Sequence, residues 1–237
     1  MSNIFRATKY QLMMFKPQAL LCLAIIAANI LISVTVTYLF PGSGVSAGSS
    51  DLIAFIWIFI LGLLSFKPSF KFMLANAVSR KSLFWANIFS MAILSVALAV
   101  VVTLVLTFIN RMHIDIIVLY TQLYGDNGPT SSVVWFISVF YLLIVIGWFI
   151  NMVYYRSSRR MAYAISFAPF VISGLFIAIN QTTHGKLFES IIRIIVTAMG
   201  FSGNIPNPYF GSFSMLLLTV IICAINYRLI RKMQIKE

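Results

Sequence analysis

The chain has 237 residues, of which 61% are hydrophobic and only 9% are charged, and its mean hydropathy is +0.98. A soluble domain holds about 45–50% apolar and about 25% charged residues, so this composition excludes a soluble globular protein and indicates an integral membrane protein throughout. The net charge is +12. Because the basic residues lie at the ends of apolar runs, they are typical of membrane orientation rather than of nucleic-acid binding.

The N-terminal segment, residues 3–16, is basic and amphipathic. At helical spacing one side of the segment carries the basic residues Arg6, Lys9 and Lys16. The other side carries the apolar residues Ile4, Ala7, Met14 and Phe15. We therefore expect an interfacial helix over residues 1–18, with its cations near anionic lipid and Pro17 separating it from the first span. The segment is too polar for a signal peptide, so the first span is expected to stay in the mature protein.

Six apolar runs are long enough to cross a bilayer, which takes about 20 helical residues. They are expected at about residues 19–40, 51–66, 84–109, 133–154, 161–179 and 210–230. Between the third and fourth, Asp126-Asn127-Gly128-Pro129 is a strong turn signal. In the fifth span Pro169 is expected to kink the helix. The sequence thus predicts an all-α membrane protein with a single transmembrane domain, residues 1–237.

Residues 67–87, between the second and third spans, carry four basic residues and no acid. Lys67 and Pro68 are expected to end the second span, and Ser79 is expected to cap a new helix. Between them the apolar residues recur at helical spacing and form one stripe: Phe70, Met73, Leu74, Ala77 and Val78. A loop that only orients the protein needs the charges but not the stripe. We therefore favour a docking element for a cytoplasmic partner.

The segment of residues 180–209 is expected on the outer side. Lys186–Met199 is too polar at its start to be a seventh span and reads as a short helix, on which Glu189 and Arg193 are spaced to form an i, i+4 ion pair. The following run, GFSGNIPNPYFG, breaks any helix. This segment either dips into the outer leaflet or lies on the surface.

The distribution of charge predicts the orientation. Fourteen of the 17 basic residues fall on one side of the six spans: Arg6, Lys9, Lys16, Lys67, Lys71, Arg80, Lys81, Arg156, Arg159, Arg160, Arg228, Arg231, Lys232 and Lys236. Arg111, Lys186 and Arg193 fall on the other side, together with four acids: Asp51, Asp115, Asp126 and Glu189. The positive-inside rule therefore places both termini in the cytoplasm.

Motifs for chemistry are absent from the sequence. The two histidines, His113 and His184, fall in outer loops, and there is no HExxH motif and no GxxxxGK[ST] motif. No charged residue is expected at mid-bilayer, which argues against an ion-coupled transporter. Cys22 and Cys223 lie in apolar runs and are read as core or lipid-facing residues. We expect no catalytic site, no metal and no cofactor on this chain.

This layout resembles the transmembrane subunit of an ATP-binding-cassette exporter of the ABC-2 family, and AVSRKSLFWAN resembles that family's loose pattern at the start of span three. It is further similar to exporters of bacteriocins and of amphipathic peptide toxins, such as the phenol-soluble modulin exporter. The resemblance implies a bacterial plasma-membrane permease that moves hydrophobic or amphipathic cargo, such as peptide, outward. It further implies a second permease copy or a related permease, and a separate ATPase dimer that binds ATP and Mg.

By the same resemblance, the docking helix for the ATPase comprises eight residues: Phe70, Met73, Leu74, Ala77, Val78, Ser79, Arg80 and Lys81. Two alternatives remain open. One is the substrate-binding membrane subunit of a vitamin-type importer, which would hold a small vitamin. The other is a permease that exports lipid or polysaccharide.

Overall fold

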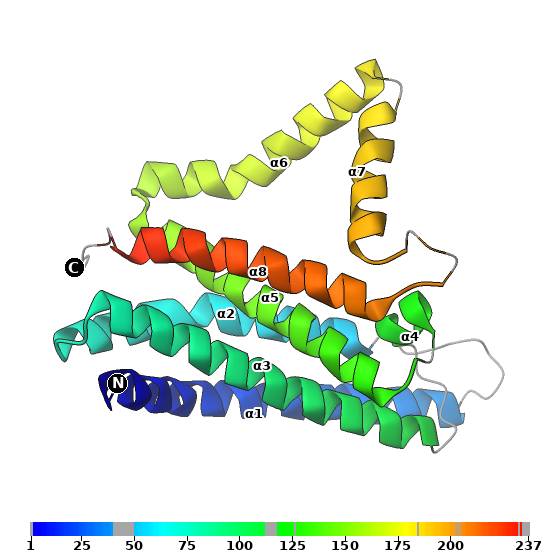
Figure 1. Ribbon diagram of the computed structural model, residues 1–237, viewed down its shortest axis with the longest axis horizontal. Coiled ribbons are helices and arrows are strands. Elements are labelled where there is room, and N and C mark those ends of the chain that lie inside the picture. The colour runs from blue at the N-terminus through cyan, green and yellow to red at the C-terminus, as the bar shows by residue number, and fades with distance from the viewer. Residues whose placement is uncertain are drawn as a thin grey trace.

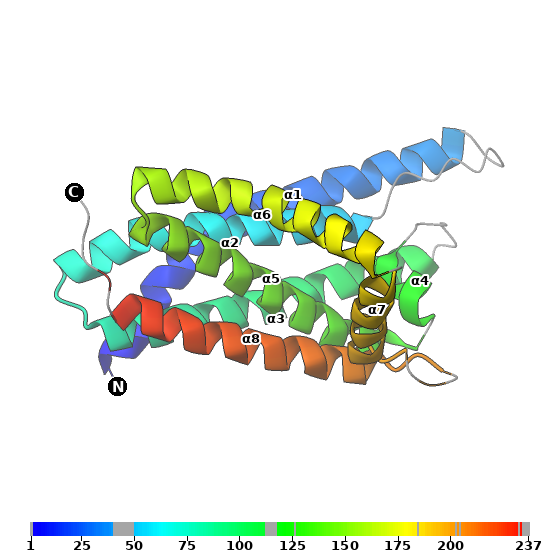
Figure 2. The same cartoon turned by 90° about the horizontal axis from the view of Figure 1, so that it is seen from above.

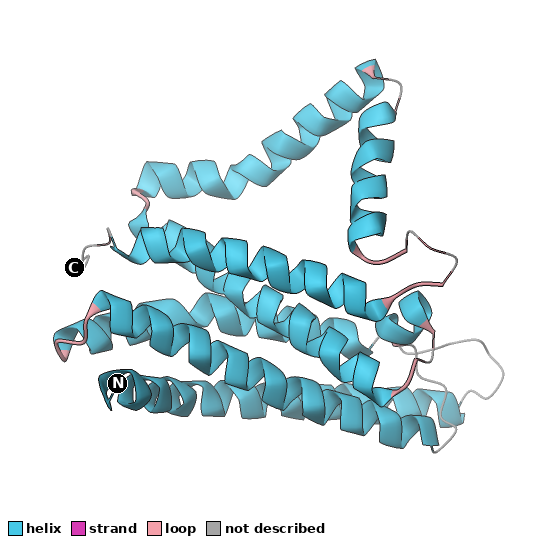
Figure 3. Ribbon diagram, viewed as in Figure 1, coloured by secondary structure: helices cyan, strands magenta, loops and turns pink. Residues whose placement is uncertain are grey.

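The computed structural model describes residues 2–39, 50–111, 118–125, 127–183, 185–201, 203, 205–231 and 233. All regular structure in these ranges is helical (Figure 3). The eight helices are α1 (Ser2–Leu39), α2 (Ser50–Ala75), α3 (Arg80–Arg111), α4 (Leu119–Tyr124), α5 (Pro129–Arg156), α6 (Arg159–Thr182), α7 (Lys186–Ala198) and α8 (Pro208–Arg231). All but α4 and α7 are long and apolar enough to span a membrane, which confirms the predicted six-helix membrane protein.

Five of the long helices, α1, α2, α3, α5 and α8, lie side by side as a bundle (Figure 1). Helix α5 is at its centre and packs against α2, α3 and α8. Large aromatic residues of α5 are fully buried there, including Trp135, Phe140 and Trp148. Rings from neighbouring helices meet them edge-on, such as Phe55 against Phe140 with 6.0 Å between ring centroids. Aromatic contacts between α5 and the helices around it are therefore a substantial part of a core that is otherwise largely aliphatic.

Helices α6 and α7 leave this bundle and form two sides of a triangle whose third side is α8 (Figure 1). Helix α6 is bent in the picture, and Pro169 lies inside it, as the sequence predicts. None of the residues in its most apolar stretch is buried. Helix α7 follows the predicted short helix within one residue and likewise has no buried residue.

Helix α1 is continuous from Ser2 to Leu39, so the prediction of a separate interfacial helix ending at Pro17 is not confirmed. Pro17 lies inside the helix, and Figure 2 shows a bend between its dark-blue first part and the lighter-blue remainder. Ala7 and Phe15, two residues of the predicted apolar side, are buried, and Tyr10 stacks on Phe72 at 4.4 Å, so much of this side packs on the protein. Met14, expected on that side, is exposed.

Helix α2 also runs further than predicted. It continues through positions 67 and 68 to Ala75, although a proline inside a helix removes one backbone hydrogen bond. Aromatic packing on both sides of these positions outweighs that cost. Phe66 stacks on Phe70 at 4.9 Å, and both rings pack edge-on against Tyr155 of α5. The expected boundary between the second span and the docking helix is therefore absent.

The start of α1 and the end of α8 lie at one end of the bundle, together with the α2–α3 turn and the α5–α6 turn (Figures 1 and 2). We call this the basic end, because exposed basic residues gather there: Arg6, Lys9, Lys71, Arg80, Lys81, Arg156, Arg160, Arg228 and Arg231. Helix α4 and the connection from α7 to α8 lie at the opposite end. The helix directions thus bring together the charges that the sequence placed on one side.

Candidate functional site

The α2–α3 turn is a well-defined hairpin between two long helices. After α2 ends, Val78 N–H donates to the Met73 carbonyl at 3.0 Å and Ala77 N–H donates to the Leu74 carbonyl at 3.1 Å. Ala77 has φ of 55°, the left-handed conformation. These features form a Schellman motif, which satisfies carbonyls that the helix end leaves free. Because Ala77 and Val78 belong to this turn, their predicted place on a helical stripe is wrong.

Ser79 caps the start of α3, as predicted. Its hydroxyl accepts a hydrogen bond from Ser82 N–H at 3.1 Å, the geometry of an N-cap, and α3 starts at Arg80. Arg80 and Lys81 occupy the first helical turn and are exposed. Positive charge at a helix N-terminus is opposed by the helix dipole, so these residues do not stabilise the helix that carries them.

Arg80 has a second contact that the sequence did not indicate. Its guanidinium Nη1 donates to the carbonyl oxygen of Arg231, the last residue of α8, at 2.8 Å. Cations near a helix C-terminus satisfy free carbonyls and complement the dipole. The start of α3 is thereby joined to the end of α8. Two segments 151 positions apart in the sequence meet at the basic end.

In the structure, most residues of the expected docking stripe face the core of the bundle rather than a partner. Phe70 and Met73 are 0% and 2% exposed, because they pack inward against the core rather than facing solvent. Leu74 and Val78 are half-buried and contact the same core. The apolar stripe therefore holds α2 to its own bundle, and at least Phe70 and Met73 are not accessible to a partner. The reason is long-range: Tyr155 of α5 supplies the surface against which Phe70 packs.

The residues that remain accessible around the turn form a different surface. We call it the turn surface, and it comprises Lys71, Phe72, Ala75, Asn76, Ala77, Ser79, Arg80 and Lys81. It combines three cations with one half-exposed aromatic ring, Phe72, which is 48% exposed. Neither Lys71 nor Phe72 belongs to the predicted stripe. Both are exposed, and the Phe72 ring stacks on Tyr10 of α1.

At the other end of the bundle, α4 is fixed to the start of α2 and to the end of α7. Asp51, in the first turn of α2, accepts a hydrogen bond from Leu119 N–H at 2.7 Å. The Tyr124 hydroxyl donates to the Met199 carbonyl at 2.8 Å. Burial raises the pKa of the Tyr124 hydroxyl above its ordinary value, so Tyr124 stays a neutral donor. The sequence did not predict α4, because six residues are too few for a periodic signal.

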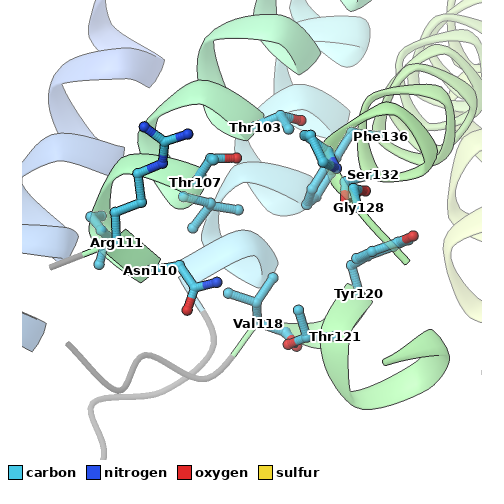
Figure 4. A pocket seen from close by; sticks show the side chains of 13 residues that line it. Thr103, Thr107, Asn110, Arg111, Val118, Tyr120, Thr121, Gly128, Ser132 and Phe136 are labelled. Carbon is cyan, nitrogen blue, oxygen red and sulfur yellow. Dashed lines mark hydrogen bonds between the residues drawn. The ribbon is translucent and has the colours of Figure 1, made fainter. Parts of the chain in front are cut away.

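A cavity of about 470 Å³ lies beside α4, between the end of α3 and the start of α5 (Figure 4). Its lining is mixed and includes polar residues of α3: Thr103, Thr107, Asn110 and Arg111. We call it the α3–α5 pocket. No sequence motif marks it, because its residues come from three helices that only the fold brings together.

The remaining predicted residues do not assemble into a site. Glu189 and Arg193 both lie exposed on α7, and among the residues described no salt bridge joins them. His113 and His184 fall outside the described residues, as do Asp115 and Asp126. Cys22 and Cys223 are free thiols within α1 and α8. In the described ranges, no group of three metal-ligating side chains comes together.

Comparison with known proteins found no matching family model, no matching curated protein and no matching solved structure.

Proposed function

We propose that this chain is the permease subunit of an ATP-driven exporter, and that a separate ATPase subunit docks on the turn surface. The proposal rests on the layout of six apolar helices and on the resemblance of AVSRKSLFWAN to the ABC-2 pattern. The single observation that supports it best is the turn itself. It is exposed, basic and fixed by a Schellman motif, a serine cap and the Arg80–Arg231 hydrogen bond.

In this proposal the basic end faces the cytoplasm of a bacterial cell, as the positive-inside rule predicts. The ATPase approaches the turn surface with complementary negative charge, because Lys71, Arg80 and Lys81 are all exposed there. Phe72 supplies an aromatic anchor for the same partner. In this proposal the turn surface replaces the buried stripe as the docking element. It lies within residues 67–87, the segment in which the sequence predicted docking.

The contacts of the turn suggest how movement of the ATPase reaches the membrane. Helices α2 and α5 pack closely, and the Asn151 side-chain amide donates to the Leu63 carbonyl between them. Arg80 joins α3 to α8. A displacement of the turn by the ATPase therefore moves four helices together rather than one loop. Tightly packed elements transmit small shifts in this way.

The proposed cargo is hydrophobic or amphipathic, such as peptide. After Arg160, α6 carries no charged residue, and its large apolar side chains are exposed, including Phe167 and Phe170. These surfaces fit an apolar cargo or a second permease that would complete the path. ATP and Mg belong to the partner ATPase in this scheme, and this chain supplies the path and the docking surface.

The test compares two charge reversals of equal size at the basic end. The docking variant is Lys71→Glu with Lys81→Glu, and the control is Arg6→Glu with Arg160→Glu; all four residues are exposed. Each protein is purified from its native host, and the co-purifying nucleotide-binding subunit is detected by photolabelling with azido-ATP. We expect the docking variant to lose that subunit about tenfold or more, which corresponds to about 1.4 kcal/mol, while the control retains it.

Both variants remove the same positive charge from the same end, so any effect on membrane orientation is matched. Retention of the ATP-binding subunit by the docking variant, with loss in the control, would assign docking to a surface other than the α2–α3 turn.

A further inference from the structure

The α3–α5 pocket has a location that matters for its chemistry. It lies where the apolar span Arg80–Arg111 ends and the span Pro129–Arg156 begins. A bilayer places its polar headgroups at the ends of such spans. The pocket is lined partly by apolar side chains, such as Leu106 and Phe136, and partly by hydroxyl and amide groups. It therefore offers both environments that an amphiphile needs.

The charge of the pocket favours an anion. Arg111 is the single cation among the lining residues that the structure describes, and no acid is among them. Helix α5 begins at the pocket with Gly128 as its N-cap and Pro129 as its first residue, and no side chain of the described residues caps its first turn. The free N–H groups and positive dipole of a helix start attract negative groups.

Thr103 gives an independent reason to expect a ligand. It is 4% exposed, it lines the pocket, and its hydroxyl oxygen has no hydrogen-bond partner among the residues that the structure describes. A threonine or serine inside a helix normally donates to the carbonyl four residues earlier, as Ser95 does to Met91. A buried hydroxyl without a partner is costly, so a group bound in the pocket that accepts its hydrogen bond would be stabilised there. Thr103, Thr107 and Arg111 follow at intervals of four along α3, so one face carries all three (Figure 4).

We infer that the α3–α5 pocket binds the phosphate headgroup of an anionic phospholipid. Arg111 and the start of α5 hold the phosphate, and the Thr107 hydroxyl donates to the headgroup. Thr103, about two helical turns deeper than Arg111 along α3, donates to an ester carbonyl oxygen next to the glycerol. Leu106 and Phe136 pack against the glycerol and the first acyl carbons. A lipid is preferred over a free ion because the pocket lies at headgroup depth and half of its lining is apolar. The α3–α5 pocket is separate from the turn surface, and lipid binding in it does not depend on the proposed docking of an ATPase.

The test is a lipid titration of the full purified chain in detergent, read by native mass spectrometry. The probes are phosphatidylglycerol, diacylglycerol with the same acyl chains, and inorganic phosphate. We expect the chain to bind one phosphatidylglycerol above background, diacylglycerol to bind at least tenfold more weakly, and millimolar phosphate to leave the lipid in place. Arg111→Gln should weaken the binding of phosphatidylglycerol about tenfold, because an arginine–phosphate contact is a strong charge-assisted hydrogen bond.

Thr103→Val is the second variant, with an expected loss of about threefold, since it removes one neutral hydroxyl. Arg193→Gln is the matched control, because Arg193 is an exposed arginine on α7 that does not line the pocket, and it should leave binding unchanged. Size-exclusion profiles confirm that each variant is folded. Equal binding of diacylglycerol, displacement by phosphate, or equal effects of Arg111→Gln and Arg193→Gln would each overturn the assignment.

Discussion

Gly62 of α2 and Gly147 of α5 pack against the backbone of the opposite helix. A Cβ atom on Gly62 would overlap the Ile144 carbonyl oxygen, and one on Gly147 would overlap the Phe59 carbonyl oxygen. Small residues allow helix backbones to approach this closely, and close packing drives association where water is absent. One turn further along α5, Asn151 donates to the Leu63 carbonyl of α2. This contact fixes the central pair of helices in the bundle.

We predict that Gly62→Leu and Gly147→Leu each force α2 and α5 apart. Overpacking of this kind costs about 1–3 kcal/mol, which corresponds to a fall in melting temperature of about 2–12 °C for a chain of this size. The measurement is thermal unfolding of the purified protein in detergent, followed by tryptophan fluorescence.

The matched control is Gly174→Leu in α6, where an added Cβ meets nothing within 4 Å. Leucine is about 1 kcal/mol better than glycine inside a helix, so this variant should be at least as stable as the unmodified protein. If all three variants lower the melting temperature equally, the close α2–α5 contact is not what the substitutions disturb.

At the α2–α3 turn we predict a substitution that raises the stability of the protein, in contrast to the glycine substitutions between α2 and α5. Ala77 is held in the left-handed conformation, which costs a residue with a Cβ about 1–2 kcal/mol. Ala77→Gly removes that cost and should raise the free energy of unfolding by about 1 kcal/mol, less the entropy that glycine gains in the unfolded chain. Ala75→Gly, in the last turn of α2, should lower it by up to about 1 kcal/mol. Urea titration of both variants distinguishes them, and a loss of stability in Ala77→Gly would contradict the Schellman geometry.

The local signals in the sequence predicted much of this fold. Long apolar runs identified all six spanning helices, because a run of about 20 apolar residues is rarely anything other than a membrane-spanning helix. Ser79 followed by a basic turn predicted the start of α3, and the structure places its N-cap there. Each of these signals depends on neighbouring residues alone.

Features that depend on distant partners were not predicted. The stripe at Phe70 and Met73 was interpreted as a partner surface, but Tyr155 of α5 and the surrounding core cover it. Helical periodicity shows that a face is apolar but not what covers it. Likewise, Lys67 and Pro68 indicated a helix end, while aromatic packing on either side of them keeps α2 continuous. The Arg80–Arg231 contact and the α3–α5 pocket also require the fold.

Asp51 provides a test of how α4 is held at the end opposite the termini. Its carboxylate accepts the Leu119 N–H at the first residue of α4. Asp51→Ala leaves that donor without its partner, which costs about 1–3 kcal/mol, so α4 should open more often. Amide hydrogen exchange over residues 119–124 should accelerate about tenfold or more in this variant.

Asp51→Asn is the control, because an asparagine keeps an acceptor oxygen at the same position and should preserve most of the protection. Unchanged exchange in Asp51→Ala would show that α4 is held by its tyrosines, Tyr120 and Tyr124, rather than by this hydrogen bond.

The most direct test of the account places a photo-crosslinking amino acid at Lys81, in the turn surface, and in a matched protein at Arg160, in the α5–α6 turn. Both positions are exposed at the basic end. After irradiation in intact cells, adducts are purified through this chain and probed with azido-ATP. We predict an ATP-binding adduct from position 81 and a much weaker one from position 160. An ATP-binding adduct from position 160 alone would contradict docking at the α2–α3 turn.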